Sequence, residues 1–217
     1  MIRRMTFIAA AVALVFSPAF AASETPSGKP SAAEAPFVTK MAADLGARFA
    51  TTDAAVKAGY LRYTDEDETG AISYANRQWT SADATHPSQL WYDARGKLLG
   101  ADFSVPQTGA PPQLFGVDPQ RWQKFGLHIH YGLVGPSGTT TYGATSAKKL
   151  AAAGGDPKMP TAPDLVKLGI AKRPADVRFV FVFPAIWDLP VWIMPNPDGA
   201  FAEKNPNVKP VAAKGGM

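Results

Sequence analysis

The segment QLWYDARGKLLGADFSV, residues 89–105, predicts a β-hairpin. Asp93 opens a four-residue turn, and Gly96 stands where the backbone of such turns often needs a positive φ. The flanks, residues 90–92 and 98–105, are rich in apolar and aromatic residues and are the predicted strands. Because so short a turn joins only antiparallel strands, this segment indicates an antiparallel sheet.

The rest of the chain also divides into short segments with strand or helix character. Further strands are expected at residues 71–80, 126–134, 177–183 and about 189–194. Pro184 and Pro190 are expected to break the chain between the last two of these strands. Helices are expected at residues 36–50, 52–58, 146–155 and 161–170, with a short one starting at Asp118 and Pro119. Residues 135–146 are expected to be a loop.

Regular alternation of strand and helix is missing from this order of elements. We therefore expect an α+β fold with a mostly antiparallel sheet and short flanking helices. A strongly curved or barrel-like sheet fits the same pattern.

The chain begins with features of a secretory signal peptide over residues 1–21. Arg3 and Arg4 precede an apolar run, residues 7–16, that is too short to cross a bilayer. Ala19 and Ala21 supply the small side chains that a signal peptidase reads. The sequence thus predicts a periplasmic or secreted protein that keeps no stable membrane span after cleavage.

The mature chain is expected to be one domain behind a short leader. Residues 22–36 are rich in Ser, Pro and Ala, which is typical of a flexible leader. Residues 37–217 have the size of a single globular domain, with a C-terminal tail rich in Pro and Gly.

Composition removes several classes of function. The chain has no Cys, which excludes disulfides, thiolate nucleophiles and Cys-type zinc sites. Its formal net charge of +4 falls to about +2 once Arg3 and Arg4 are removed. That charge is too small to indicate a nucleic-acid partner.

Two of the chain's three histidines, His128 and His130, stand one residue apart in KFGLHIHYGLV, residues 124–134. On a β-strand, residues two apart point to the same face, with Cα atoms roughly 7 Å apart. Two imidazoles at that spacing can converge on one ion at metal–nitrogen distances of about 2 Å. The pattern predicts a metal site for zinc or copper.

His86 is the only other imidazole and the predicted third ligand. Pro87 biases His86 toward an extended backbone, from which its side chain can lean over a neighbouring strand. Water or a carboxylate would complete the site, and the predicted set includes Asp188. The sequence does not rank the other candidate carboxylates, which are Glu66, Asp67, Asp93 and Asp102.

Two functions remain open at this stage. In the first, the exported chain binds zinc or copper and carries metal-assisted hydrolytic or redox activity. In the second, the histidines are structural, and the chain is a non-catalytic binding protein for a small ligand or a protein partner.

Two further features have mainly structural interpretations. Residues 65–76 partly match a calcium-binding loop, but the final Glu of that motif is replaced by Asn76. We therefore interpret this stretch as a solvated acidic loop. Trp91 and Trp187 stand beside polar candidates and could line a pocket, although core packing is the simpler interpretation.

Overall fold

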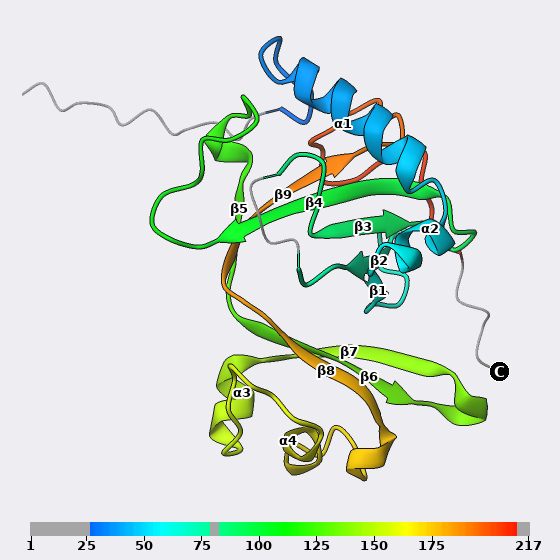
Figure 1. The fold of residues 1–217 in the computed structure, drawn as a ribbon, viewed down its shortest axis with the longest axis vertical. Helices are drawn as coiled ribbons and strands as arrows, with labels where there is room; N and C mark the ends of the chain where they lie inside the picture. The colour runs from blue at the N-terminus through cyan, green and yellow to red at the C-terminus, as the bar shows by residue number, and fades with distance from the viewer. Residues whose placement is uncertain (1–26, 79–82, 212–217) are drawn as a thin grey trace, which may run out of the picture.

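The structure is a computed structural model that describes residues 27–78 and 83–211 (Figure 1). The helices in the described part of the chain are α1 (Ala35–Arg48), α2 (Thr52–Lys57), α3 (Ala147–Ala152) and α4 (Ala162–Lys167). The strands there are β1 (Leu61–Arg62), β2 (Ile72–Ala75), β3 (Gln89–Tyr92), β4 (Leu98–Pro106), β5 (Gln123–Phe125), β6 (His128–Val134), β7 (Thr140–Ser146), β8 (Val177–Phe183) and β9 (Ile186–Trp192). The predicted signal peptide, residues 1–21, lies outside these residues.

The strands form two antiparallel sheets, which confirms the α+β prediction. One has the order β1-β2-β3-β4-β9-β5, and the other has the order β7-β6-β8. The predicted hairpin is β3–β4, and Gly96 in its turn has a φ of 79°. Neither sheet closes into a barrel, because each ends in strands with a neighbour on one side only.

Two chain segments run through both sheets and join them. β5 leads into β6 through Gly126 and Leu127, and β8 leads into β9 through Pro184 and Ala185. In Figure 1, both segments pass from the upper, six-stranded sheet to the lower, three-stranded one. Because β5 pairs with β9 and β6 with β8, the β5–β6 and β8–β9 connections lie side by side. Together they hold the two sheets against each other.

Helix α1 covers one face of the six-stranded sheet (Figure 1). Phe37, Met41 and Leu45 are buried on it, at the spacing expected of an amphipathic helix. On β4, Ala101 and Phe103 belong to the same core cluster as these residues. Because side chains alternate along a strand, the residues between and beyond them, such as Asp102, point to the opposite face of the sheet.

The three-stranded sheet also has two different faces. His128 and His130 pair with Phe183 and Phe181 on β8, so these four side chains share the face turned toward the larger sheet. Helices α3 and α4 lie on the other face (Figure 1). Ile129, which points to that face, is fully buried.

Three local predictions are wrong. Residues 140–146, expected within a loop, form β7 and pair with β6 along its length. The helix expected from Pro119 is a single 3-10 turn, Pro119–Arg121, because the chain then enters β5. Pro190, expected to break a strand, lies inside β9. Its nitrogen points away from β4, since the Trp192 N–H two residues later donates to the Ala200 carbonyl.

The described part of the predicted leader, residues 27–36, contacts the rest of the chain. Arg121 donates to the carbonyls of Ser27 and Lys29, and it forms a buried ion pair with Glu34 at 2.6 Å. Helix α1 itself starts at Ala35, so it includes the last two residues of the predicted leader. Among the described residues, no helix has the length and apolar character needed to cross a membrane.

Candidate functional site

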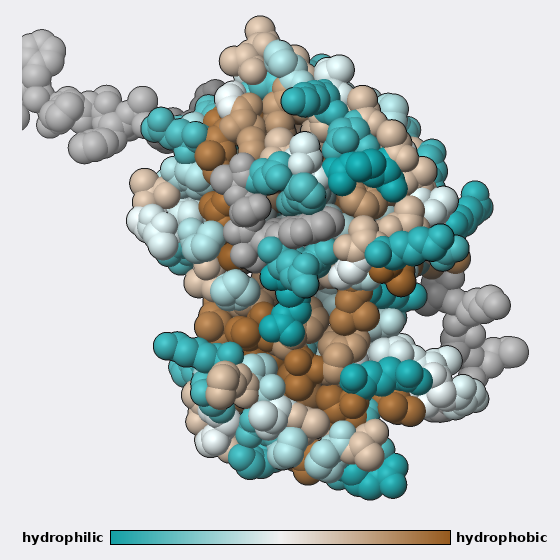
Figure 2. Space-filling view, viewed as in Figure 1, coloured by the Kyte–Doolittle hydropathy of each residue, from teal (hydrophilic) through white to brown (hydrophobic). Residues whose placement is uncertain are grey.

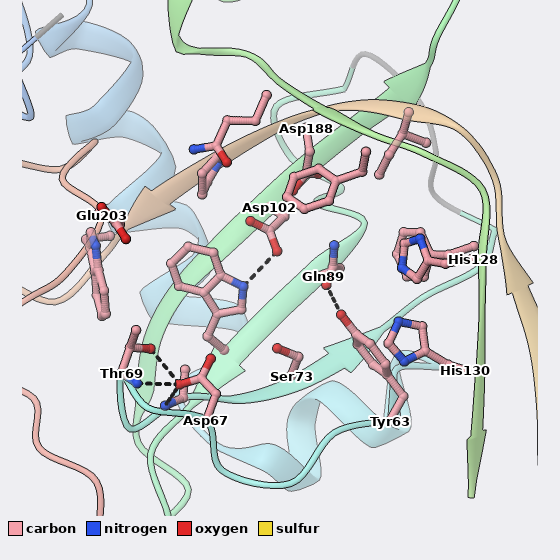
Figure 3. Close-up of a pocket in the computed structure, with 18 of the residues that line it drawn as sticks. Tyr63, Asp67, Thr69, Ser73, Gln89, Asp102, His128, His130, Asp188 and Glu203 are labelled. Atoms are coloured by element: carbon pink, nitrogen blue, oxygen red, sulfur yellow. Dashed lines mark hydrogen bonds between the residues drawn. The ribbon is translucent and has the colours of Figure 1, made fainter. Parts of the chain in front are cut away.

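A cavity of about 410 Å³ lies where the polar face of the larger sheet meets the histidine face of the smaller one (Figure 3). The polar residues lining it are Tyr63, Asp67, Thr69, Ser73, Gln89, Asp102, Gln123, His128, His130, Asp188 and Glu203. Its aromatic walls include Trp91, Phe125, Phe183, Trp192 and Phe201. The cavity is thus formed by strands from both sheets and by a segment near the C-terminus.

The histidine pair lies on one wall, as the strand periodicity predicts. The rings of His128 and His130 are 4.9 Å apart between centroids. His128 Nδ1 lies 2.7 Å from the Gly126 carbonyl oxygen, and because a carbonyl only accepts, Nδ1 carries the proton. Nε2 is therefore the ring nitrogen of His128 that remains for another partner, and the Phe183 ring stacks on the imidazole with centroids 5.3 Å apart.

His130 is a neutral imidazole at physiological pH. Its ring packs edge-on against Tyr63 with centroids 4.6 Å apart. Burial lowers the pKa of His130 to about 4, with a further contribution from the charge that His128 carries when protonated. A neutral ring keeps one nitrogen as an acceptor, so His130 can accept a hydrogen bond or bind a metal ion.

Tyr63 and Gln89 form a hydrogen-bonded pair at the centre of the cavity (Figure 3). The Tyr63 hydroxyl donates to Gln89 Oε1, and burial raises the pKa of Tyr63 well above its ordinary value. The amide nitrogen of Gln89 has no hydrogen-bond partner among the described residues, although this side chain is only 6% exposed. In Figure 3 it points into the cavity.

Asp102 and Asp188 form a buried carboxyl pair on the opposite wall. They are 6% and 5% exposed, and they hydrogen-bond each other. Trp91 Nε1 donates to Asp102 Oδ2 at 2.8 Å, and Ser104 Oγ donates to Asp188 Oδ1 at 2.5 Å. Both carboxyl groups are therefore held in place by neutral donors.

Burial makes this pair retain protons at pH values where carboxylates are usually ionised. It raises the pKa of Asp188 to about 7, against the lowering effect of its hydrogen bonds to Ser104 and Asp102. Burial and the neighbouring Asp188 charge raise the pKa of Asp102 well above its ordinary value. At neutral pH the pair holds at least one proton and carries at most one negative charge.

The position of Trp91 depends on a glycine in the neighbouring strand. Trp91 on β3 pairs with Gly100 on β4, and a Cβ atom at Gly100 would lie 2.4 Å from the indole Cε3. Only glycine lets the indole lie flat over the strand and reach the Asp102 carboxyl group.

Three of the four predicted metal ligands line the cavity, and one does not. His128, His130 and Asp188 are among its lining residues, while His86 is not. His86 Nδ1 lies 2.6 Å from Asp83 Oδ2, in a loop that Arg48 of α1 ties down through the Thr85 carbonyl. His86 therefore lies at the end of α1 and does not complete the pair.

The described residues contain no group of three or more His, Cys, Asp or Glu side chains placed to hold a metal ion. The fold thus brings His128, His130 and Asp188 to one cavity but does not arrange them as a coordination site. Of the other candidate carboxylates, Asp102 and Asp67 line the cavity, whereas Asp93 accepts hydrogen bonds in the hairpin turn and Glu66 accepts one from Val211.

The acidic loop that partly matches a calcium site is held by its own backbone. Asp67 Oδ1 accepts hydrogen bonds from the Thr69 and Ala71 amides and from the Thr69 hydroxyl. Asp65 forms an ion pair with Arg62 at 3.3 Å. Asp67 is thus a turn former that borders the cavity, and Asp65 is held by an ion pair outside its lining.

The two tryptophans singled out in the sequence have different roles. Trp91 lines the cavity, whereas Trp187 belongs to the core cluster on the α1 side of the larger sheet. Asp188 follows Trp187 directly, so strand alternation sends the two side chains to opposite faces.

Sequence reasoning missed Tyr63 and Gln89 and considered Asp102 only as an unranked carboxylate. One signal was present, since Asp102 and Ser104 alternate with apolar residues along a strand otherwise buried throughout its centre. The partnership of Ser104 with Asp188, 84 residues away, depends on the β4–β9 register and is not visible in the sequence.

Comparison with family models, curated proteins and solved structures finds no match to this chain. The chemistry of the cavity is therefore argued from its own residues.

Proposed function

We propose that this chain binds a small organic molecule in the cavity between its two sheets, as a non-catalytic binding protein. The observation that carries the proposal is the cavity itself, whose volume of about 410 Å³ falls within the range of small-molecule sites. Such sites combine apolar walls with a few fixed polar groups, and this cavity has both.

The polar groups are held in place before any ligand arrives. Gly126 orients His128, Tyr63 orients Gln89, and Trp91 orients Asp102, each through one hydrogen bond. A site whose side chains are already ordered loses less conformational entropy on binding, which favours affinity.

The three histidines provide a matched test of this proposal. Wild-type protein and the variants His128→Ala, His130→Ala and His86→Ala are compared in a thermal-shift screen against a library of small organic molecules. We expect compounds that stabilise the wild type and His86→Ala but stabilise the two cavity variants less. Equal stabilisation of all four proteins would place binding elsewhere and refute the proposal.

A metal site remains a second candidate, favoured by the orientation of His128. Metal-bound imidazoles usually donate their second ring nitrogen to a carbonyl or carboxylate, as His128 Nδ1 does to Gly126. With His130 and Asp188 on the same cavity, side-chain rotation would have to bring a third ligand to the ion. Zinc with an open position would support hydrolysis, and copper would support redox chemistry.

Metal content measured by mass spectrometry tests this second candidate. The protein is purified without a histidine tag, together with His128→Ala, His130→Ala and the control His86→Ala. Near-stoichiometric zinc or copper that is lost in the first two variants but kept in the third would support a metal function. Absence of metal in the wild type, with no gain in stability on adding either ion, would exclude it.

We also propose that the chain is exported, on the basis of residues 1–21. The intact mass of the chain recovered from the periplasm or the medium tests this directly. Cleavage after Ala21 supports export, whereas a full-length chain found only in the cytoplasm would contradict it.

A further inference from the structure

The cavity has an unusual balance of charge for this chain. The formal net charge of the whole sequence is +4, yet the described residues that line the cavity include four carboxyl groups and no Lys or Arg. Figure 3 shows Asp67, Asp102, Asp188 and Glu203 distributed around it. Among these lining residues, the basic side chains are the imidazoles of His128 and His130.

The buried pair is the part of this arrangement that most requires a partner. Asp102 and Asp188 are more than nine-tenths buried, and among the described residues neither forms an ion pair. Buried carboxylates are normally matched by a cation, because removing their charge from water is costly. Here the donors are a neutral indole and a neutral hydroxyl, and burial raises the pKa of both carboxyl groups.

The walls next to the pair are aromatic and suit a cation with an apolar body. Trp91, which donates to Asp102, packs edge-on against Trp192 with ring centroids 5.4 Å apart. Both line the cavity, as does Phe183. The faces of such rings attract cations, most strongly where water is excluded.

A hydrogen-bond donor that faces the cavity is a second feature that a ligand can use. The Gln89 amide nitrogen points into the cavity without a partner among the described residues, on a side chain that is 94% buried. Because this nitrogen is not among the fully buried unpaired atoms of the described residues, it is accessible from the cavity, where water or a ligand can accept its hydrogen bond. A ligand that carries an acceptor near its cationic group would satisfy both Gln89 and the acidic pair.

From the cavity, the unpaired acids, the aromatic walls and the free amide, we propose that the ligand is an organic cation. Its protonated amine lies against Asp102 and Asp188, and its apolar or aromatic body packs against Trp91 and Trp192. This inference rests on the proposed binding function and names the chemical class of the ligand.

Three probes of similar size and shape but different charge test the inference on the wild-type protein. They are phenethylammonium, phenethyl alcohol and phenylacetate, titrated calorimetrically at pH 7 in the presence of EDTA. The cation should bind about tenfold to a hundredfold more tightly than the alcohol, the usual effect of a charge-assisted hydrogen bond, and phenylacetate should bind most weakly. This comparison needs no variant, so a folding defect cannot obscure it.

Variants then locate the cation within the cavity. Asp188→Asn and Asp102→Asn keep the side-chain volume and the hydrogen-bond acceptor, and circular dichroism checks that each is folded. Both should weaken phenethylammonium at least about tenfold and leave phenethyl alcohol nearly unchanged. His86→Ala, outside the cavity, should change neither.

The outcomes separate this inference from the function on which it rests. If the alcohol or phenylacetate binds as well as the cation, the cavity is a binding site but the charge assignment is wrong. If none of the three probes binds at millimolar concentration, the cation assignment is likewise overturned, and the histidine-variant screen decides the binding function separately. Cation binding that survives both Asp variants would also overturn the assignment.

Discussion

Replacing Asp188 by Asn should change how the stability of the folded chain depends on pH. Burial raises the pKa of Asp188 from its ordinary value of 3.8 to about 7 in the folded chain. Between those two pH values, the folded chain holds a proton that the unfolded chain has released. The free energy of unfolding therefore falls as pH rises through this window, and the contribution from the neutral carboxyl is complete only below pH 3.8.

The size of the effect follows from this difference in pKa. One proton bound only by the folded chain changes the free energy of unfolding by about 1.4 kcal/mol per pH unit. Between pH 5 and pH 7 the loss is about 2 kcal/mol, because Asp188 is already half ionised at the upper limit. Asn cannot titrate, and its carbonyl oxygen can still accept the hydrogen bond from Ser104.

Other groups titrate near this window, but they affect both proteins. Burial lowers the pKa of His130 to about 4, so its contribution to stability rises with pH up to the ordinary value of 6.5 and opposes that of Asp188. Asp102, whose pKa is raised, acts in the same direction as Asp188 and loses the neighbouring charge in the variant. The difference between variant and wild type therefore isolates the carboxyl pair.

Urea unfolding at pH 5, 6 and 7 measures this difference. Relative to wild type, Asp188→Asn should become more stable by about 2 kcal/mol between pH 5 and pH 7. Asp198→Asn, at an exposed carboxylate, serves as the control and should show no such trend. A difference between Asp188→Asn and wild type that stays constant across the three pH values would refute the account of a protonated buried pair.

Two further changes test the contacts that hold the site together. Arg121→Ala should lower the free energy of unfolding at pH 7 by about 3 kcal/mol, because it leaves Glu34 buried without its counter-charge. Arg173→Ala, which breaks an ion pair in which the arginine side chain is 76% exposed, should cost far less stability than Arg121→Ala, and equal losses by urea unfolding would contradict the argument. Gly100→Ala should destabilise the chain by about 1–3 kcal/mol and shift the tryptophan fluorescence of the chain, because the added Cβ displaces the Trp91 indole from Asp102. Unchanged stability and fluorescence in this variant would show that Gly100 does not position Trp91.

The hairpin and the histidine pair could be predicted because both depend on local geometry. The turn at Asp93 and Gly96 restricts the backbone within four residues, and its flanks follow as antiparallel strands. His128 and His130 share a face because side chains alternate along any extended chain. These properties hold whatever the strand packs against.

Predictions from the local sequence pattern were less successful where the structure of a segment depends on residues far away in the chain. Residues 140–146 contain Gly143 and Ser146 and resemble a loop. Pairing with β6 satisfies the hydrogen-bonding groups of their backbone and makes them a strand. His86 has the right chemistry for a third ligand, but its loop is tied to the end of α1 through Arg48. The residues near His86 in the sequence do not indicate which element its loop contacts in the folded chain.

The sequence alone determined the β3–β4 hairpin with its antiparallel pairing and the shared face of the two histidines. The cavity was decided by the way the two sheets meet, whereas the carboxyl pair of Asp102 and Asp188 and the contact between Tyr63 and Gln89 were decided by the pairing of strands within the larger sheet. The physical reason is that alternation along a strand needs only the neighbouring residues, whereas register and sheet packing are set by the burial of side chains far apart in the chain.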